Sequence, residues 1–251
     1  STAPLMNGSF RQLDEASAKT ILAEAGMSVP FIHQLKMPEA TAATLDHIDL
    51  AYPMAAKICS SDIGHKTEIG GVRLNITSKR ELSTAIADIL TNVQRHAPDV
   101  RLEGILIESM IENPIAELMV SLRRDAQFGL ILTIASGGVL TEILQDASTL
   151  LVPADDLSVL ATLDSLRMAR LLGGFRGGPA VSRQAILDQI QALVRLMHAR
   201  SDIVEIEINP MMLGPDYAIC ADALITVIDG NDPPDNTSSH AANSGSHKRS
   251  N

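Results

Sequence analysis

The sequence contains no tryptophan, and aromatic residues make up only 2% of its 251 residues. Proteins that bind single-stranded nucleic acids stack bases on aromatic side chains, so this composition argues against that class. Positive charge is also in short supply, because 20 lysines and arginines stand against 30 aspartates and glutamates, for a net charge of -10. An acidic chain with a pI near 5.1 is poorly suited to nucleic acid or to an anionic membrane surface.

Cysteine and long apolar runs are equally scarce. Cys59 and Cys220 are too few for a disulfide framework, and both lie in or beside apolar strand-like runs. We therefore expect inert, reduced thiols and a cytoplasmic protein. No apolar run approaches the roughly 20 residues that a transmembrane helix needs, and the polar start at residues 1–12 lacks a signal-peptide pattern.

The remaining composition is that of an ordinary globular protein, with 45% apolar and 20% charged residues. Such a length allows one large domain or two small ones. Residues 231–251 carry almost no apolar side chains, so we predict a disordered tail there. The folded unit is expected to run from about residue 12 to residue 230, after an N-terminal extension at residues 1–11.

Helical and strand-like patterns alternate along the first part of this unit, residues 12–103. An apolar stripe predicts an amphipathic helix around residues 82–93, and a second helix is predicted from Pro38 to about residue 50. Strand-like runs end at Lys57 and cover residues 72–76. We predict that this part forms a small lobe of helices and strands.

The second part, residues 104–230, is richer in strands and is predicted to form a larger lobe. Three β-prone runs, at residues 104–107, 116–122 and 130–135, are spaced like antiparallel neighbours. The predicted helices are 139–146, 157–172 and one around 186–197, and the predicted closing strands are 203–208 and 218–221, the last extending toward 227. The fold class we predict is α+β (α/β), with a mostly antiparallel central sheet.

The stretch from Lys57 to Val72 carries the most specific chemical signal. An apolar strand delivers a lysine, whose charge can hold phosphate oxygens, and a polar loop then presents His65, a candidate nucleophile. Gly70 and Gly71 follow, and a glycine pair lets the backbone approach an anion. Each feature also has an ordinary explanation: a strand-edge lysine, a loop histidine and a turn.

A second group of polar residues lies near the end of the folded unit. Alternation from Glu205 onward places Glu207 and Asn209 on one face of a strand, which Pro210 is expected to end. A hairpin can then bring Asp222 beside them. Three oxygen ligands without nitrogen or sulfur are typical of a Mg²⁺ site, although a solvated acidic face would show the same spacing.

Two further features are less specific by themselves. Glu108 follows an apolar strand-like run and could accept hydrogen bonds from a ligand, or it could be an exposed carboxylate at a strand end. Gly137 and Gly138 form another pair at the boundary of an element, where turns also use glycine. All of these groups suit one ligand, a magnesium-bound nucleoside triphosphate.

In chain order these motifs resemble the ATP-grasp domain (beta-type subunit) of ADP-forming (NDP-forming) acyl-CoA synthetases, the acetate–CoA ligase (ADP-forming) family. The likeness covers roughly residues 12–228 and departs from the family pattern at Ala135-Ser136, where a further glycine is common. It is carried by Lys57 through Val72, Leu13-Asp14-Glu15 with Ala25-Gly26, Glu117-Leu118 with Arg124–Gly129, Gly137–Glu142, Leu171–Pro179 and Glu205–Pro210.

The resemblance implies an ATP-grasp fold, in which two α+β lobes clamp ATP or ADP with Mg²⁺. It matches Lys57 to the lysine that holds the phosphates, and Glu108 to the strand that contacts adenine and ribose. Arg73 and Arg176 could extend the clamp or form surface salt bridges. The implied cofactor-binding residues are Lys57, Glu108, Met110, Gly70, Gly71, Gly137 and Gly138, and the implied metal ligands are Glu207, Asn209 and Asp222.

The same resemblance matches His65 to a histidine implicated in phosphoryl transfer. It implies an acid–thiol ligase that couples ATP to thioester formation between a small carboxylic acid and CoA. Such enzymes also need a CoA-binding domain and a domain bearing the principal phosphohistidine, which do not fit in this sequence. We therefore expect a larger partner subunit that supplies both, and the polar start and tail favour a separate subunit over the end of a fusion.

Two alternatives stay open at this stage. A different ATP-grasp carboxylate ligase would form an acyl phosphate without using His65, and a nucleotide-binding regulatory subunit would perform no chemistry. Detection of phosphohistidine after incubation with labelled ATP would distinguish the predicted synthetase from the first alternative. Measurable ATP/ADP exchange in the presence of the partner would exclude the second. The acyl substrate, the direction of flux and the oligomeric state are not encoded in these motifs.

Overall fold

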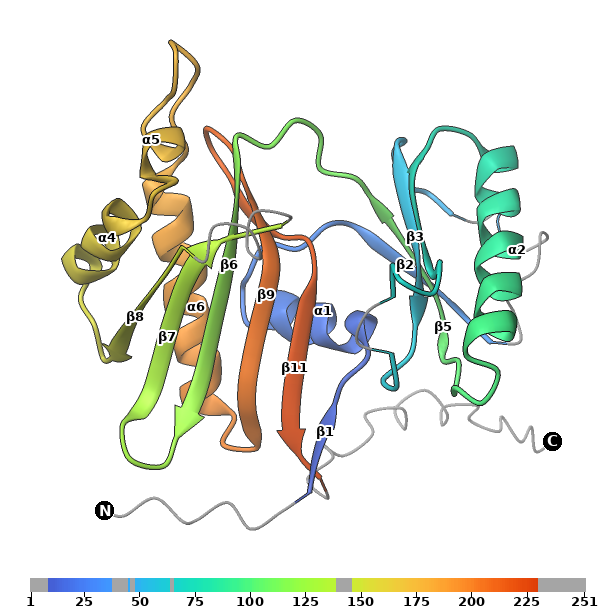
Figure 1. Ribbon diagram of the computed structural model, residues 1–251, viewed down its shortest axis with the longest axis horizontal. Helices are drawn as coiled ribbons and strands as arrows, with labels where there is room; N and C mark the ends of the chain where they lie inside the picture. Colours follow the sequence, from blue (N-terminus) through green and yellow to red (C-terminus); the bar gives the residue numbers. More distant parts are fainter. Residues whose placement is uncertain (1–8, 38–44, 46–47, 64–65, 139–145, 230–251) are drawn as a thin grey trace, which may run out of the picture.

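The computed structural model describes residues 9–37, 45, 48–63, 66–138 and 146–229. Over these residues the chain forms two antiparallel sheets that lie side by side, each covered by helices (Figure 1). The strand order is β1-β11-β9-β6-β7-β8 in the larger sheet, where β10 also pairs with β9, and β2-β5-β3-β4 in the smaller one. A mixed α and β fold with antiparallel sheets is therefore confirmed.

The larger sheet carries its helices on one face. Helix α6 begins after Ser182, whose hydroxyl accepts a hydrogen bond from the Ala185 amide, and its apolar stripe is buried against the strands. The strands are β1 (Phe10–Gln12), β6 (Ala116–Asp125), β7 (Gly129–Ser136), β8 (Ala147–Val152), β9 (Ile203–Leu213), β10 (Ala218–Cys220) and β11 (Ala223–Ile228). The helices are α1 (Glu15–Glu24), α4 (Asp156–Ser165), α5 (Ala169–Leu172) and α6 (Arg183–Ala199).

The smaller sheet has its own apolar core beneath one long helix, α2 (Lys79–His96). Ser78 caps this helix by accepting a hydrogen bond from the Glu81 amide, while the Glu81 carboxylate accepts one from the Thr77 amide. The predicted stripe of α2 is buried against the sheet, apart from a partly buried Leu90. The strands are β2 (Ile32–Lys36), β3 (Met54–Cys59), β4 (Val72–Ile76) and β5 (Gly104–Ser109).

Strand β5 differs from its predicted place. The sequence spacing predicts that residues 104–107 neighbour the strand that starts at residue 116, but β5 instead pairs with β2 and β3 in the smaller sheet. Its run is buried from Gly104 to Glu108, as suits a central strand with partners on both sides. The predicted lobe boundary between residues 103 and 104 thus runs through the smaller sheet, because the partners of β5 lie far away in the sequence.

Strand β9 also continues past the point where Pro210 was expected to end it. The pairing passes from Leu118–Met211 to Val120–Ile208, so β9 has one more residue than β6 between these pairs. Such a bulge accommodates a residue without an amide hydrogen. The Pro210 carbonyl still accepts a hydrogen bond from the Ala221 amide, which carries the strand onward to Leu213.

Smaller differences concern the ends of elements. Strand β1 pairs with β11 from Phe10, so the larger sheet begins inside the predicted extension at residues 1–11. Strand β8 was not predicted, the helix predicted over residues 157–172 is divided into α4 and α5, and the last strand is divided into β10 and β11. The predicted tail and most of the helices predicted at residues 38–50 and 139–146 lie outside the described residues.

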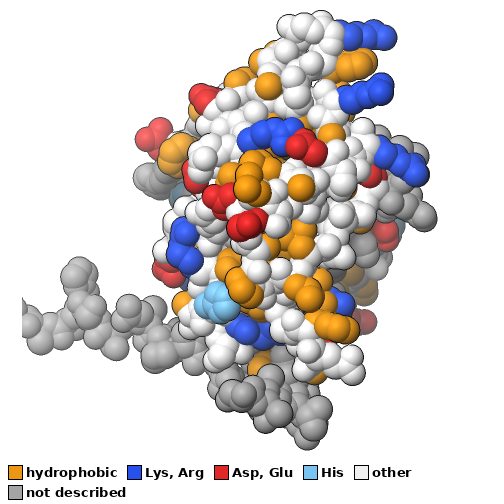
Figure 2. Space-filling model, turned by 90° about the vertical axis from the view of Figure 1, so that its left-hand side faces the viewer, with side chains coloured by type: hydrophobic (Ala, Val, Ile, Leu, Met, Phe, Trp, Pro, Cys, Tyr) orange, Lys and Arg blue, Asp and Glu red, His pale blue; other side chains and the backbone are white. Residues whose placement is uncertain are grey.

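The surface formed by α4, α5 and β8 mixes scattered apolar side chains with charges of both signs (Figure 2). Leu151 and Leu157 are among the exposed apolar residues. Single exposed apolar side chains are common on soluble proteins and need no special explanation. Among the described residues, no helix is long and apolar enough to cross a membrane.

Candidate functional site

A cavity of about 760 Å³ opens between the two sheets. The smaller sheet contributes residues of β3, β4 and β5 to its wall, and the larger sheet contributes residues of β9 and β11 together with the start of α1. The charged and polar lining residues include Glu15, Lys57, Lys66, Glu108, Glu207, Asn209 and Asp222, and Met110 also lines the cavity. Six of the residues predicted from the sequence therefore meet at one place: Lys57, Glu108, Met110, Glu207, Asn209 and Asp222.

Lys57 reaches this cavity because of its position on a central strand. Its neighbours Ala56 and Ile58 are buried in the core under α2, so alternation directs Lys57 to the opposite face of the sheet. There its ammonium group lies 2.9 Å from Glu15 Oε1 and 2.7 Å from Glu108 Oε1. It also donates a hydrogen bond of 3.2 Å to the Ala221 carbonyl, so its three donors meet three acceptors.

Glu15 is the centre of a buried charge cluster. It is the first residue of α1, after the N-cap Asp14, and is only 2% exposed. Its carboxylate accepts hydrogen bonds from Lys19 at 2.8 Å, from Lys57 and from Lys66 at 2.5 Å. Burial alone would raise the pKa of Glu15, but the three ammonium charges outweigh it and hold the pKa well below its usual range.

Glu108 is the second carboxylate of this cluster. It is 5% exposed and contacts both Lys57 and Lys19, so in this structure its oxygens bind lysines, whereas the sequence predicts a contact with a nucleotide. Burial would lower the pKa of Lys57, but the negative charges of Glu15, Glu108 and Asp222 raise it instead. Lys57 is therefore a fixed cation at neutral pH.

Three members of the cluster were not among the predicted site residues: Glu15, Lys19 and Lys66. The available signal is that Glu15 and Lys19 lie four residues apart, on the same helix face as the buried Ala18 and Leu22. Oppositely charged residues at this spacing on an apolar face indicate a buried ion pair. Nothing in the local pattern shows that Lys57 of a distant strand joins them.

Glu207, Asn209 and Asp222 form the acidic part of the cavity wall. The Asn209 amide donates to the Asp222 carbonyl at 3.2 Å, and Glu207 pairs with Leu224 of the adjacent strand. Burial raises the pKa of Glu207, and the charges of Glu205 and Asp222 add to the effect. Burial and repulsion from the charge of Glu15 also raise the pKa of Asp222. The charges of Lys57, Lys66 and Lys19 act to lower it but do not outweigh them.

This acidic part has the chemistry of a hard-cation site. Its donors are oxygens alone, two carboxylates and one amide, and the crowded negative charge of Glu207 and Asp222 would be relieved by a cation. The Asn209 side-chain oxygen accepts a hydrogen bond of 3.1 Å from the Gly138 amide, which fixes its orientation. No cluster of three or more His, Cys, Asp or Glu placed to hold a metal occurs among the described residues.

The glycine pairs lie outside the cavity lining, and their amides are used within the chain. The Gly71 and Gly70 amides donate to the carbonyls of Lys66 and Thr67, closing a tight turn after β3. The Gly137 amide donates to the Glu117 carbonyl at 2.8 Å, and the Gly138 amide to Asn209. These glycines are also closely packed within the chain, and the contact of their backbone with phosphate stays a prediction.

Substitution of Gly137 by alanine should be costly for this reason. A Cβ at this position would lie 2.5 to 2.8 Å from backbone atoms of Leu118, which cannot rotate away. We expect Gly137→Ala to lower the free energy of unfolding by about 1–3 kcal/mol, as overpacking does. Urea denaturation would measure this loss. Gly173→Ala is the control, since its Cβ would have no neighbour closer than 3.9 Å, and equal losses in both variants would contradict the packing role.

Two other residues predicted from the sequence are His65 and Met110. His65 lies outside the described residues. Met110, an implied cofactor-binding residue, lines the cavity, and its amide already donates a hydrogen bond of 2.9 Å to the Pro53 carbonyl.

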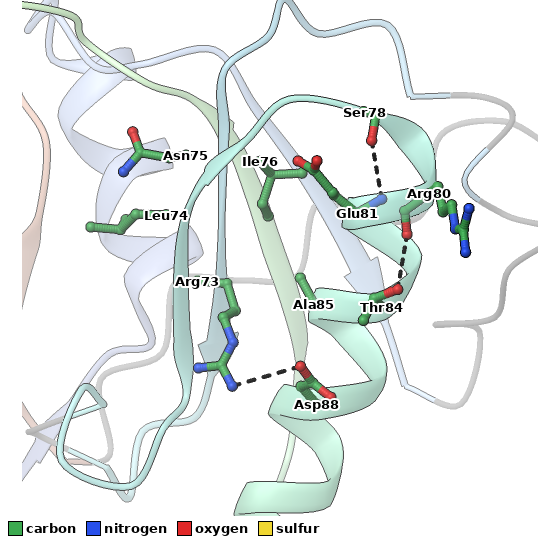
Figure 3. Close-up of a pocket in the computed structure, with 10 residues that line it drawn as sticks. All are labelled: Arg73, Leu74, Asn75, Ile76, Ser78, Arg80, Glu81, Thr84, Ala85 and Asp88. Carbon is green, nitrogen blue, oxygen red and sulfur yellow. Dashed lines mark hydrogen bonds and ion pairs between the residues drawn. The ribbon is translucent and has the colours of Figure 1, made fainter.

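The two candidate arginines lie away from the cavity lining. Arg73 of β4 approaches Asp88 of α2 at 3.8 Å on the surface, beside a second hollow of about 490 Å³ (Figure 3). Arg176 stacks over the Phe175 ring, with 5.2 Å between the guanidinium carbon and the ring centroid. The surface ion pair of Arg73 matches the second of its two predicted uses.

The chain is similar to characterised proteins over most of its length. The ATP-grasp domain family matches residues 5–227. Subunit beta of acetate–CoA ligase (ADP-forming) I from Pyrococcus furiosus is 34% identical over 214 residues, which cover 85% of this chain and 90% of that subunit. Trans-feruloyl-CoA synthase FCS1 from an unknown prokaryotic organism is 33% identical over 215 residues, but this chain spans only 30% of that longer protein.

Solved structures show the same relationship at the level of the fold. The dinucleotide-forming acetyl-coenzyme A synthetase 1 of Ca. Korarchaeum cryptofilum, in complex with coenzyme A and Ca-AMPCP, is 30% identical with a TM-score of 0.79, and the match covers 86% of this chain and 93% of that chain. A second structure of that synthetase, 27% identical with a TM-score of 0.72 and the same coverage, contains coenzyme A and Mg-AMPPCP. Its phosphohistidine segment points towards the nucleotide-binding site.

Proposed function

Because the chain belongs to the ATP-grasp domain family, together with the beta subunits of ADP-forming acetate–CoA ligases, we propose that it is the nucleotide-binding subunit of an ADP-forming acyl-CoA synthetase. The observation that carries this proposal is the cavity between the sheets, where the cations Lys57 and Lys66 face the oxygen ligands of Glu207, Asn209 and Asp222. A magnesium-bound nucleoside triphosphate requires both kinds of group.

The two parts of the wall divide the work of binding the nucleotide. Lys57 and Lys66 would neutralise phosphate oxygens, while Glu207, Asn209 and Asp222 would hold Mg²⁺. The metal, when bound, would supply further positive charge to the phosphate chain. Glu108 and Met110 lie on the side of β5, where the resemblance assigns contacts with adenine and ribose.

His65 is proposed as the phosphoryl acceptor within this chain. A neutral imidazole nitrogen would attack the γ-phosphorus in line, the bond from that phosphorus to the β,γ-bridging oxygen would break, and ADP would leave. The phosphohistidine would then pass its phosphoryl group, through the histidine of the partner, to a carboxylate. Attack of the CoA thiol on the acyl phosphate would form the thioester and release phosphate.

The proposal includes a second subunit for the later steps. This chain spans 90% of the length of the P. furiosus beta subunit but only 30% of the feruloyl-CoA synthase, whose remaining length has no counterpart here. We propose a larger partner subunit that binds CoA and carries the principal phosphohistidine.

We also propose a cytoplasmic location. Cys59 and Cys220 are buried and free, and burial raises the pKa of each thiol to about 12, which suits a reducing compartment.

The proposal predicts the products of the assembled enzyme. The chain, purified with its larger partner and supplied with ATP, Mg²⁺, CoA and a panel of short carboxylic acids, should form ADP and acyl-CoA in equal amounts. Product chromatography would measure both, and omission of CoA is the control that should stop thioester formation. Formation of AMP would contradict the assigned reaction class, and turnover without phosphohistidine would favour another ATP-grasp ligase.

A further inference from the structure

The three buried lysines around Glu15 are not equivalent. Lys19 is fully buried, contacts only the cluster carboxylates among its recorded partners, and does not line the cavity. Lys57 lines the cavity, but its three ammonium donors already meet Glu15, Glu108 and the Ala221 carbonyl. In this arrangement, Lys57 must release a partner before it can donate to a ligand.

Lys66 is in a different position. It lines the cavity with 13% of its side chain exposed, and within the described part of the chain its ammonium group has one acceptor, Glu15 Oε2 at 2.5 Å. An ammonium group has three donors, so two are available to a ligand in the cavity. Lys66 is therefore the cluster lysine best placed to bind an anion.

The position of Lys66 is set from both sheets. The turn after β3 holds its backbone, since the Lys66 carbonyl accepts the Gly71 amide at 2.8 Å and the Gly71 carbonyl accepts the Ile58 amide. Glu15 holds its side chain from α1, which packs on the larger sheet. The two oxygens of Glu15 are divided, with Oε1 accepting from Lys19 and Lys57 and Oε2 from Lys66.

The charge of Lys66 is also secure. Burial would lower its pKa, but the negative charges of Glu15 and Asp222 raise it, so the side chain is protonated at neutral pH. A protonated amine with unused donors can bind phosphate oxygens strongly.

We propose that Lys66 is a second phosphate-binding residue of this cavity, and that Glu15 is the positioning residue that aims it at the nucleotide. This inference rests on the proposed function, because it takes the ligand to be a nucleoside triphosphate. Lys66 would contact the phosphates beyond the α-phosphate, so its contribution should depend on the length of the phosphate chain.

The test compares binding of ATP and AMP to the full chain in the presence of Mg²⁺. For Lys66→Met we expect the Kd for ATP to rise about 10- to 100-fold, the effect of losing a charge-assisted hydrogen bond, while the Kd for AMP changes less than about twofold. Lys66→Arg keeps the charge and should retain most of the preference for ATP. Lys36→Met, at an exposed end of β2, is the matched control and should bind both nucleotides normally.

The positioning role of Glu15 has a separate readout. Glu15→Asp keeps the charge but shortens the side chain, so it should weaken ATP binding more than AMP binding. Its effect should be smaller in a Lys66→Met background, because both changes act on the contact between Glu15 and Lys66. Equal losses for ATP and AMP, or full additivity of the two substitutions, would show a merely structural role and overturn the assignment.

Failure of this inference can be told apart from failure of the proposed function. If the unmodified chain binds Mg-ATP and both Lys66 variants bind it equally well, the role of Lys66 is wrong while the proposed function stands. If the unmodified chain binds no Mg-ATP, the proposed function itself fails. Thermal unfolding of each variant shows whether a change in affinity follows from misfolding. If Lys66→Met does not fold, Lys66→Gln, which also removes the charge, takes its place and should show the same selective loss of ATP binding.

Discussion

His65→Ala is expected to reduce acyl-CoA formation by the complex on the order of 1,000-fold or more, because removal of a nucleophile that acts in a relay stops the whole sequence. ATP binding should change less than about twofold, since Lys57, Lys66 and the acidic wall are unaltered. Acyl-CoA formation and equilibrium binding of ATP, measured on the same preparation with the partner subunit present, would test both parts.

The expected loss has a specific chemical signature. Incubation with γ-labelled ATP should leave an acid-labile phosphohistidine on the unmodified chain and none on the variant. His96→Ala is the control, because His96 lies in the last turn of α2, away from the cavity lining, and its loss should not alter labelling. Near-normal turnover by His65→Ala would remove the histidine from the mechanism and would favour the ligase alternative that needs no phosphohistidine.

The elements with strong local signals are the ones that the sequence predicts correctly. The apolar stripes of α2 and α6 are spaced for a helix and are buried as expected. Strands β6 and β7 pair through the turn that begins at Asp125, whose carboxylate accepts the amides of Gln127 and Phe128. In each case the information lies within a few neighbouring residues.

Elements whose position depends on distant partners are predicted less well. The run of β5 reads as a buried strand, but its sequence contains no indication that its neighbours are β2 and β3. Strand β8 is a short edge strand with alternating exposure, so it presents neither a continuous apolar run nor a long pattern. Pro210 signals the end of a strand locally, and only the bulge opposite β6 explains why β9 continues.

The candidate site shows the same limit. Strand alternation places Lys57, Glu207 and Asn209 on the faces that line the cavity. Glu15 and Lys66 were not predicted, because the contact of Lys57 with Glu15 spans 42 positions in the sequence and depends on how α1 packs beside β3. Local pattern can therefore predict which residues point to a cleft, but not which charges meet inside it.

That cluster leads to the largest expected effect on stability. Glu15→Ala removes a 2% exposed carboxylate that accepts hydrogen bonds from three ammonium groups. Lys19, Lys57 and Lys66 would then repel one another in a buried space. Among the contacts described, Glu108 would remain as the close carboxylate partner of Lys19 and Lys57, and Lys66 would have none. Removal of one partner from a buried ion pair typically costs about 3–5 kcal/mol, and the free energy of unfolding should fall by that amount.

Urea denaturation at neutral pH would measure this loss against a matched change on the same helix turn. Asp14→Ala removes the N-cap acceptor of the Ala16 and Ser17 amides and of the Ser17 hydroxyl, and should cost about 1 kcal/mol. A Glu15→Ala loss no larger than that of the control would mean that Glu15 only supports the start of α1. Since domains are commonly stable by about 5–15 kcal/mol, the larger loss could leave the variant partly unfolded.

The pH dependence of the Glu15→Ala loss provides a second and independent check. The folded-state pKa of Glu15 lies well below the ordinary value of 4.5, so the unfolded chain binds the proton more readily. The stabilisation by Glu15 is therefore complete above that ordinary value and is lost as the pH falls through the lower folded-state pKa. The stability difference between the unmodified chain and Glu15→Ala should accordingly be constant near neutral pH and shrink in acid, whereas a purely steric contribution of Glu15 would give a difference that does not vary with pH.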